Sequence, residues 1–168
     1  EIWQRILEPG RQLGALPVGL AARDTLRLEA GMPLYGHELS EQIHPLQAGL
    51  KFAVQLDNHE FVGRDALLKA REDPTCPRRV GLQLEGRRVP REQYPLRFQD
   101  QVVGNVTSGT FSPTLQQPIA MAYVAPAASQ PAVTYQAIGE TSKSFTASAS
   151  CRTMATIGTY GKNGVRYP

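Results

Sequence analysis

Two arginines at helical spacing, Arg23 and Arg27, are the residues whose type and spacing most clearly permit binding chemistry. Steps of three and four residues return to one side of a helix, so Arg23, Arg27 and Ala30 would share a face. Guanidinium groups placed this way repel each other and require a carboxylate, a phosphate or water as a neighbour. Asp24 and Glu29 are near enough in sequence to neutralise them.

The arginine pair has two interpretations. In the first, it belongs to a solvated helix face whose ion pairs contribute a few tenths of a kcal/mol each. In the second, Arg23 orients a carboxylate or binds a planar, hydrogen-bonding ligand, which suits the fork of donors on a guanidinium. The residues alone leave both open.

No other side chain stands in a recognisable catalytic pattern. His44 precedes a proline and is typical of a surface loop, and neither His37 nor His59 has neighbours spaced as in a triad or a metal site. Ser108 lies outside any G-x-S-x-G elbow. The glycines lack the G-x-G-x-x-G pattern, so no dinucleotide site is predicted.

The two cysteines, Cys76 and Cys151, lie far apart without a C-x-x-C pair. They predict ordinary thiols in a reducing compartment and support neither a disulfide framework nor a zinc site.

The composition excludes several classes of protein. The formal charge is +3 with a pI near 9.0, and 20% of the residues are charged, but no long run of like charges is present. Nucleic-acid binding is therefore not expected, whereas an anionic small ligand, such as a polyglutamylated cofactor, would suit a mildly basic chain. No apolar stretch approaches the roughly 18 residues of a membrane span. The chain opens on Glu1 in mid-pattern, which leads us to expect a piece of a longer protein.

The arginine pair requires a helix to position it, and the surrounding pattern supplies one. Residues 21–31 are strong helix formers that stop at Gly31. Helices are also predicted over 1–9, up to Pro9-Gly10, and from Arg64 onward, with an alternating strand over 51–57.

The character of the chain changes at a polar, proline-bearing linker, residues 73–79. Short alternating segments separated by turns follow and predict a small antiparallel β-barrel over 80–150. We therefore expect an α+β protein: the end of an α/β domain over 1–72, then the barrel, then a divergent tail over 151–168.

Three segments in order resemble the glycine-cleavage T-protein family, the aminomethyltransferases. They are GLAARDTLRLEAGMPLYGHEL at 19–39, HPLQAGLKFAVQLDNHEFVGRDALLKA at 44–70, and the barrel segment 78–124 with its VTSGTFSPTL turn. This resemblance covers the C-terminal half of the family chain up to about residue 126. The sequence from Cys151 onward does not match the family ending, as a frameshift or a diverged tail would explain.

The resemblance implies a folate-binding domain followed by a C-terminal barrel. It implies transfer of the methylene carbon from the aminomethyl group on the lipoyl arm of the H-protein to tetrahydrofolate, with release of ammonia. Tetrahydrofolate is then the carbon-accepting co-substrate, the lipoylated H-protein is the partner, and no metal, nucleic acid or membrane is involved. Localisation in the bacterial cytoplasm is expected, with a mitochondrial matrix location left open.

Arg23, the arginine of the family's ARD motif, is implied to contact folate or substrate. Arg27, Glu29 and Tyr35 in the same motif are interpreted as helix and loop supports. The catalytic aspartate belongs to the family's N-terminal half, so no catalytic residue is assigned here. The 168-residue chain alone is expected to be inactive.

Two alternatives remain at this point. The ARD and barrel motifs also occur in the folate-binding tails of sarcosine and dimethylglycine dehydrogenases. A non-enzymatic folate-binding module, related to iron–sulfur assembly proteins, is the other; those relatives carry a cysteine-centred motif in which neither Cys76 nor Cys151 sits.

Overall fold

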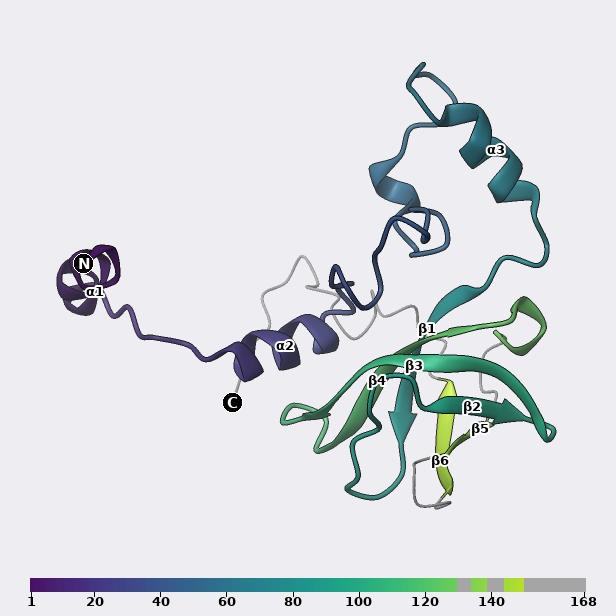
Figure 1. Ribbon diagram of the computed structural model, residues 1–168. Coiled ribbons are helices and arrows are strands. Elements are labelled where there is room, and N and C mark those ends of the chain that lie inside the picture. Colours follow the sequence, from purple (N-terminus) through teal and green to yellow (C-terminus); the bar gives the residue numbers. More distant parts are fainter. Residues whose placement is uncertain (130–133, 139–143, 150–168) are drawn as a thin grey trace, which may run out of the picture.

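The computed structural model describes residues 1–129, 134–138 and 144–149, and it divides into a helical part and a barrel (Figure 1). Helices and turns make up the first 72 residues, and the strands follow. The helical elements are α1 (Ile2–Gln12), α2 (Leu20–Glu29), η1 (Lys51–Ala53), α3 (Arg64–Glu72) and the later turn η2 (Pro126–Ala128).

Helix α2 forms because its sequence, LAARDTLRLE, is rich in good helix formers. It ends at Glu29, and Gly31, two residues later, has a φ of +68°, a left-handed conformation that glycine adopts without a Cβ penalty. The amide of Gly31 donates to Leu28 O, and that of Met32 donates to Arg27 O. This termination turns the chain back toward the barrel.

The six described strands close an antiparallel barrel in the order β1-β4-β3-β2-β5-β6. Pairing of β6 with β1 completes the ring, with Leu82 opposite Ala149. The strands are β1 (Arg78–Leu84), β2 (Pro95–Phe98), β3 (Gln101–Ser112), β4 (Gln117–Val124), β5 (Thr134–Ile138) and β6 (Ser144–Ala149).

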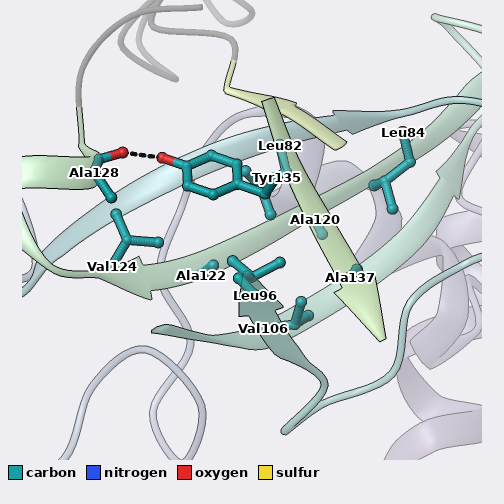
Figure 2. Packing of buried hydrophobic residues seen from close by; sticks show 10 residues of the cluster. All are labelled: Leu82, Leu84, Leu96, Val106, Ala120, Ala122, Val124, Ala128, Tyr135 and Ala137. Carbon is teal, nitrogen blue, oxygen red and sulfur yellow. Dashed lines mark hydrogen bonds between the residues drawn. The ribbon is translucent and has the colours of Figure 1, made fainter. Parts of the chain in front are cut away.

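Apolar side chains fill the barrel interior (Figure 2). Small alanines alternate with larger residues, so Tyr135 fits whole inside and donates its hydroxyl hydrogen bond to Ala128 O. The buried members are Leu82, Leu84, Leu96, Val106, Ala120, Ala122, Val124, Ala128, Tyr135 and Ala137.

Helix α2 packs against the outside of the barrel, over β3 and β4. Leu28 is fully buried against Ile119 and Met121. The hydroxyls of Thr25 and Thr110 share a hydrogen bond of 3.0 Å. The barrel thereby fixes the helix that carries the arginine pair.

Two expectations about the helical part were wrong in detail. No strand forms over 51–57, because Ala53 N bonds Leu50 O in the turn η1 and Phe52 is 86% exposed. Helix α1 continues through Pro9 to Gln12, since the exposed helix lets water satisfy the carbonyl that proline leaves unpaired.

The α+β class and the antiparallel barrel are confirmed. Strand β1 begins at Arg78, inside the linker assigned to 73–79, because Arg78 pairs with Val124. The proposed tail, 151–168, lies outside the described residues. In the part of the chain that the structure describes, no helix has the length and hydrophobicity needed to span a membrane.

Candidate functional site

A hollow of about 670 Å³ lies where α2 meets the barrel, and we call it the α2 pocket. Its walls come from α2, the turn at 34–37, the loop at 89–92 and strand β3. The lining residues are Leu20, Arg23, Asp24, Arg27, Leu34, His37, Val89, Pro90, Arg91, Glu92, Thr107, Ser108 and Gly109.

A buried network centred on Glu38 supports the pocket wall. Glu38 is fully buried and Arg27 is 7% exposed, and their charged groups lie 2.7 Å apart. Thr107 and Ser108 donate hydroxyl hydrogen bonds to Glu38 Oε1 at 2.5 and 2.6 Å. Leu34 N donates to Oε2 at 3.0 Å. A buried carboxylate with this many donors is held in one position.

The network also sets the protonation state of Glu38. Burial favours the neutral form, but the hydrogen bonds from Ser108, Thr107 and Leu34, together with the charge of Arg27, outweigh it. They hold the pKa of Glu38 below its ordinary value. Glu38 is therefore an ionised structural anchor and not a proton donor at neutral pH.

Arg27 connects helix to barrel. Its Nε donates to Asp24 Oδ1 at 2.7 Å and its Nη2 donates to Ser108 Oγ at 2.8 Å. Because all three guanidinium nitrogens donate to protein acceptors, Arg27 has little capacity left for a ligand. This confirms the interpretation of Arg27 as a support.

Arg23 lies one helical turn before Arg27, on the same pocket wall. It is exposed, and within the described residues its side chain has no hydrogen-bond or ion-pair partner. A guanidinium on a fixed helix with all its donors unused is suited to bind an anionic or planar ligand. The predicted role of Arg23 in binding folate stays a prediction.

The loop at 89–92 carries a second cation, Arg91, whose side chain has no ion-pair or hydrogen-bond partner in the part of the chain that the structure describes. Arg91 is exposed beside Pro90, and its neighbour Glu92 lies 3.2 Å from His37 Nδ1. His37 Nδ1 also lies 3.3 Å from Thr107 O. Two acceptors facing Nδ1 place a proton on that nitrogen.

Both carboxylates that line the α2 pocket are already paired with a basic side chain. Asp24 pairs with Arg27, and Glu92 pairs with His37. In the described part of the chain the pocket therefore offers cationic donors, and its lining carboxylates are not free to act as a general base. No cluster of three or more metal-ligating side chains occurs among the described residues.

Sequence reasoning found Arg23, Arg27 and Asp24, which one helix face brings together. It missed Glu38, because the partners Thr107 and Ser108 come from a strand about 70 residues away. It offered Glu29 as a partner for the arginines, which it is not, but its interpretation of Glu29 as a loop support agrees with the bond that Glu29 accepts from Ser112 at 2.5 Å in the β3–β4 turn. One signal for Glu38 was available in the sequence. Two arginines on one helix face need a second carboxylate besides Asp24 to neutralise them.

Comparisons with known proteins agree with this architecture. Residues 1–58 match the family model described as the GCVT N-terminal domain, and residues 78–152 match the glycine cleavage T-protein C-terminal barrel domain. The chain therefore belongs to the glycine cleavage T-protein family.

Curated relatives carry the corresponding name. An aminomethyltransferase of Symbiobacterium thermophilum is 52% identical over 124 residues, which are 73% of this chain and 33% of that protein. An aminomethyltransferase of Thermoanaerobacter pseudethanolicus is 48% identical over 124 residues, covering 74% of this chain and 34% of the relative. The chain thus spans about a third of the length of these relatives.

A solved structure shares the fold. The crystal structure of glycine cleavage system aminomethyltransferase T from Bartonella henselae matches with a TM-score of 0.74 and 33% identity. The match covers 82% of this chain and 39% of that one.

Proposed function

We propose that this chain contributes the α2-and-barrel side of a folate site in an aminomethyltransferase. In this proposal the enzyme transfers the methylene carbon from the aminomethyl group of the lipoylated H-protein to tetrahydrofolate and releases ammonia. The observation that carries the proposal is Arg23, whose guanidinium is unpaired among the described residues and lies on the wall of a pocket of about 670 Å³.

The shape and charge of the α2 pocket suit folate. Folate combines flat, hydrogen-bonding rings with carboxylates at the other end. Arg23 can donate two parallel hydrogen bonds to a planar group or a carboxylate, and Arg91 on the loop 89–92 adds a second positive charge. Leu20, Leu34 and Val89 supply apolar surface for the rings.

Arg23 acts in this proposal by binding and orienting the acceptor, not by proton transfer. Positioning and electrostatic stabilisation supply most of the rate in such a transfer, and the carboxylate expected to do this belongs to the family's N-terminal half. We therefore expect the 168-residue chain alone to bind tetrahydrofolate weakly and to be inactive. Family membership supports this reading over the dehydrogenase tail and the non-enzymatic module, which share only parts of the pattern.

Replacing Arg23 tests the proposal directly. A charge-assisted hydrogen bond contributes roughly 1.5–3 kcal/mol, so Arg23→Ala should weaken tetrahydrofolate binding roughly 10- to 100-fold. Calorimetric titration of the purified chain measures the dissociation constant, and Arg23→Lys, which keeps the charge but not the fork, should fall between the two.

Arg97→Ala is the matched control, because Arg97 is exposed on β2 and does not line the α2 pocket. It should leave the affinity unchanged. Equal affinity of Arg23→Ala and the parent chain, or no binding of tetrahydrofolate at all, would contradict the proposal.

A further inference from the structure

A thiol and an imidazole meet at the junction of the helical part and the barrel, away from the α2 pocket. The Sγ of Cys76 lies 3.2 Å from Nε2 of His44. Gln47 N donates to Nδ1 of the same ring at 3.1 Å. Because Nδ1 is the acceptor, the neutral ring carries its proton on Nε2 and directs it at the sulfur. His44 is thus fixed as a hydrogen-bond donor to Cys76.

The pair opens into a separate cavity of about 340 Å³, which we call the thiol pocket. Three segments build it: the turn 44–51, the end of α3 and the residues leading into β1. Four cationic side chains and one carboxylate line it: Lys51, Arg71, Arg78, Arg79 and Asp73.

The carboxylate is already satisfied, whereas two of the cations are not. Asp73 accepts from Thr75 N at 2.8 Å and from Thr75 Oγ1 at 2.7 Å. Lys51 and Arg78 have no ion-pair or side-chain hydrogen-bond partner within the described ranges. Four cationic side chains against one carboxylate give the lining a net positive charge, which favours anions, although at the sulfur itself the charge of Asp73 acts more strongly than that of Arg78.

The state of the thiol sets how it can react. Burial raises the pKa of Cys76, Asp73 acts in the same direction, and Arg78 opposes them. The thiol form thus dominates at neutral pH. The small thiolate fraction is intrinsically more nucleophilic than that of an acidic thiol, and the Nε2–H of His44 stabilises it as it forms.

We propose that Cys76, with His44 beside it, is a modification site that forms a mixed disulfide with small disulfides bearing carboxylates. The Cys76 thiolate attacks one sulfur of the reagent, so a new S–S bond forms and the original one breaks. The departing sulfur keeps the electron pair and takes up, through water, the proton that Cys76 released. The reagent is the oxidant, and Cys76 is oxidised from thiol to disulfide.

Reaction rates with single-thiol protein test this inference. Cys151→Ser removes the other cysteine, so Cys76 alone reports. An anionic disulfide, 5,5′-dithiobis(2-nitrobenzoate), is compared with the neutral 2,2′-dithiodipyridine, in the folded chain and in the chain unfolded by urea. The ratio of anionic to neutral rate should be about tenfold higher in the folded chain and should fall as salt is added. Equal ratios in the two states would overturn the proposal.

Substitutions of the two cations that are unpaired in the described structure test whether their charge selects the anionic reagent. Lys51→Gln and Arg78→Gln should each lower the ratio of the anionic to the neutral rate. Arg78→Gln should also slow the neutral reagent, because Arg78 opposes the rise in the pKa of Cys76. Arg87→Gln, an exposed arginine outside the thiol pocket, should change neither the ratio nor the neutral rate. An unchanged ratio of the two rates in both variants would contradict selection by charge.

The pH profile tests His44. With the neutral reagent, His44→Leu should move the midpoint of the rate to higher pH, because the thiolate loses its donor, while the rate at high pH stays the same. An unchanged midpoint would remove His44 from the site.

Mass spectrometry after incubation with oxidised glutathione should show a single adduct at Cys76, and its absence would contradict the proposal.

Discussion

Glu38 is the residue whose burial most constrains the site, since an ionised carboxylate with no exposed surface survives only with complete compensation. Arg27 and three hydrogen-bond donors supply that compensation and, in doing so, lock α2 against β3. Because Arg23 is on the same helix, this network also fixes the position of Arg23 on the pocket wall, although the Arg23 side chain is not part of the network.

Glu38→Gln should destabilise the chain by about 3–5 kcal/mol, because it leaves Arg27 buried with only Asp24 as an anionic partner. Urea unfolding at neutral pH measures this loss. Glu92→Gln, at a carboxylate that is 43% exposed, should cost less than about 1 kcal/mol.

The stability lost in Glu38→Gln should depend on pH. The folded-state pKa of Glu38 lies below the ordinary value of 4.5, so its ionised form contributes stability above that pH. This contribution is lost as the pH falls through the folded-state pKa. The stabilities of Glu38→Gln and the parent chain should therefore converge in acid, and a gap that stays constant with pH would refute this account of Glu38.

At the level of elements, Arg79 ties the barrel to the helical part. Its Nε donates to Ala48 O and its Nη1 donates to Gly31 O, both at 2.8 Å. One side chain at the start of β1 thereby holds the turn after α2 and the turn at 44–49. Burial lowers the pKa of Arg79, while Tyr123 and Glu38 oppose that effect.

Arg79→Lys should cost roughly 1.5–3 kcal/mol, because a single ammonium cannot reach both carbonyls along the same directions. The midpoint of urea unfolding reports the change, with Arg97→Lys as the exposed control. Identical midpoints for Arg79→Lys and the parent chain would show that the two carbonyl bonds contribute nothing net.

Two glycines of β3 allow close packing. A Cβ at Gly104 would overlap Tyr123 O on β4, and one at Gly109 would overlap Pro90 O beside the α2 pocket. Each alanine substitution should destabilise by about 1–3 kcal/mol. Gly19→Ala, where a Cβ meets nothing within 4 Å, should cost less than about 1 kcal/mol in the same unfolding measurement. Equal effects at all three sites would contradict the overlap.

The elements were predictable where the local pattern and the tertiary environment agree. Helix α2 has both good helix formers and a glycine stop, and the short apolar segments between turns do pair as antiparallel strands of the barrel. The alternation at 51–57 predicted a strand wrongly, because no neighbouring strand offers it backbone partners in the described structure. Only the site residues on α2 itself were predictable from the sequence. Arg91, Glu38 and the pairing of His44 with Cys76 depend on contacts between distant segments.

Over the whole molecule, the chain corresponds to about a third of its curated relatives. Helix α1 stands apart from the barrel (Figure 1), with Trp3 60% exposed. The α2 pocket is open, so the proposed folate site has one described side. An assay of the purified 168-residue chain with aminomethylated H-protein and tetrahydrofolate should yield no methylenetetrahydrofolate. Turnover by the chain alone would contradict the expected inactivity.

The central claim is that the α2 pocket is the folate-binding surface of this chain. Titration of tetrahydrofolate into the isotopically labelled chain, followed by amide chemical shifts, tests it most directly. We expect the largest changes at Arg23, His37, Arg91 and Ser108, with none at Cys76 in the thiol pocket. Changes confined to other surfaces, or no changes at saturating tetrahydrofolate, would contradict it.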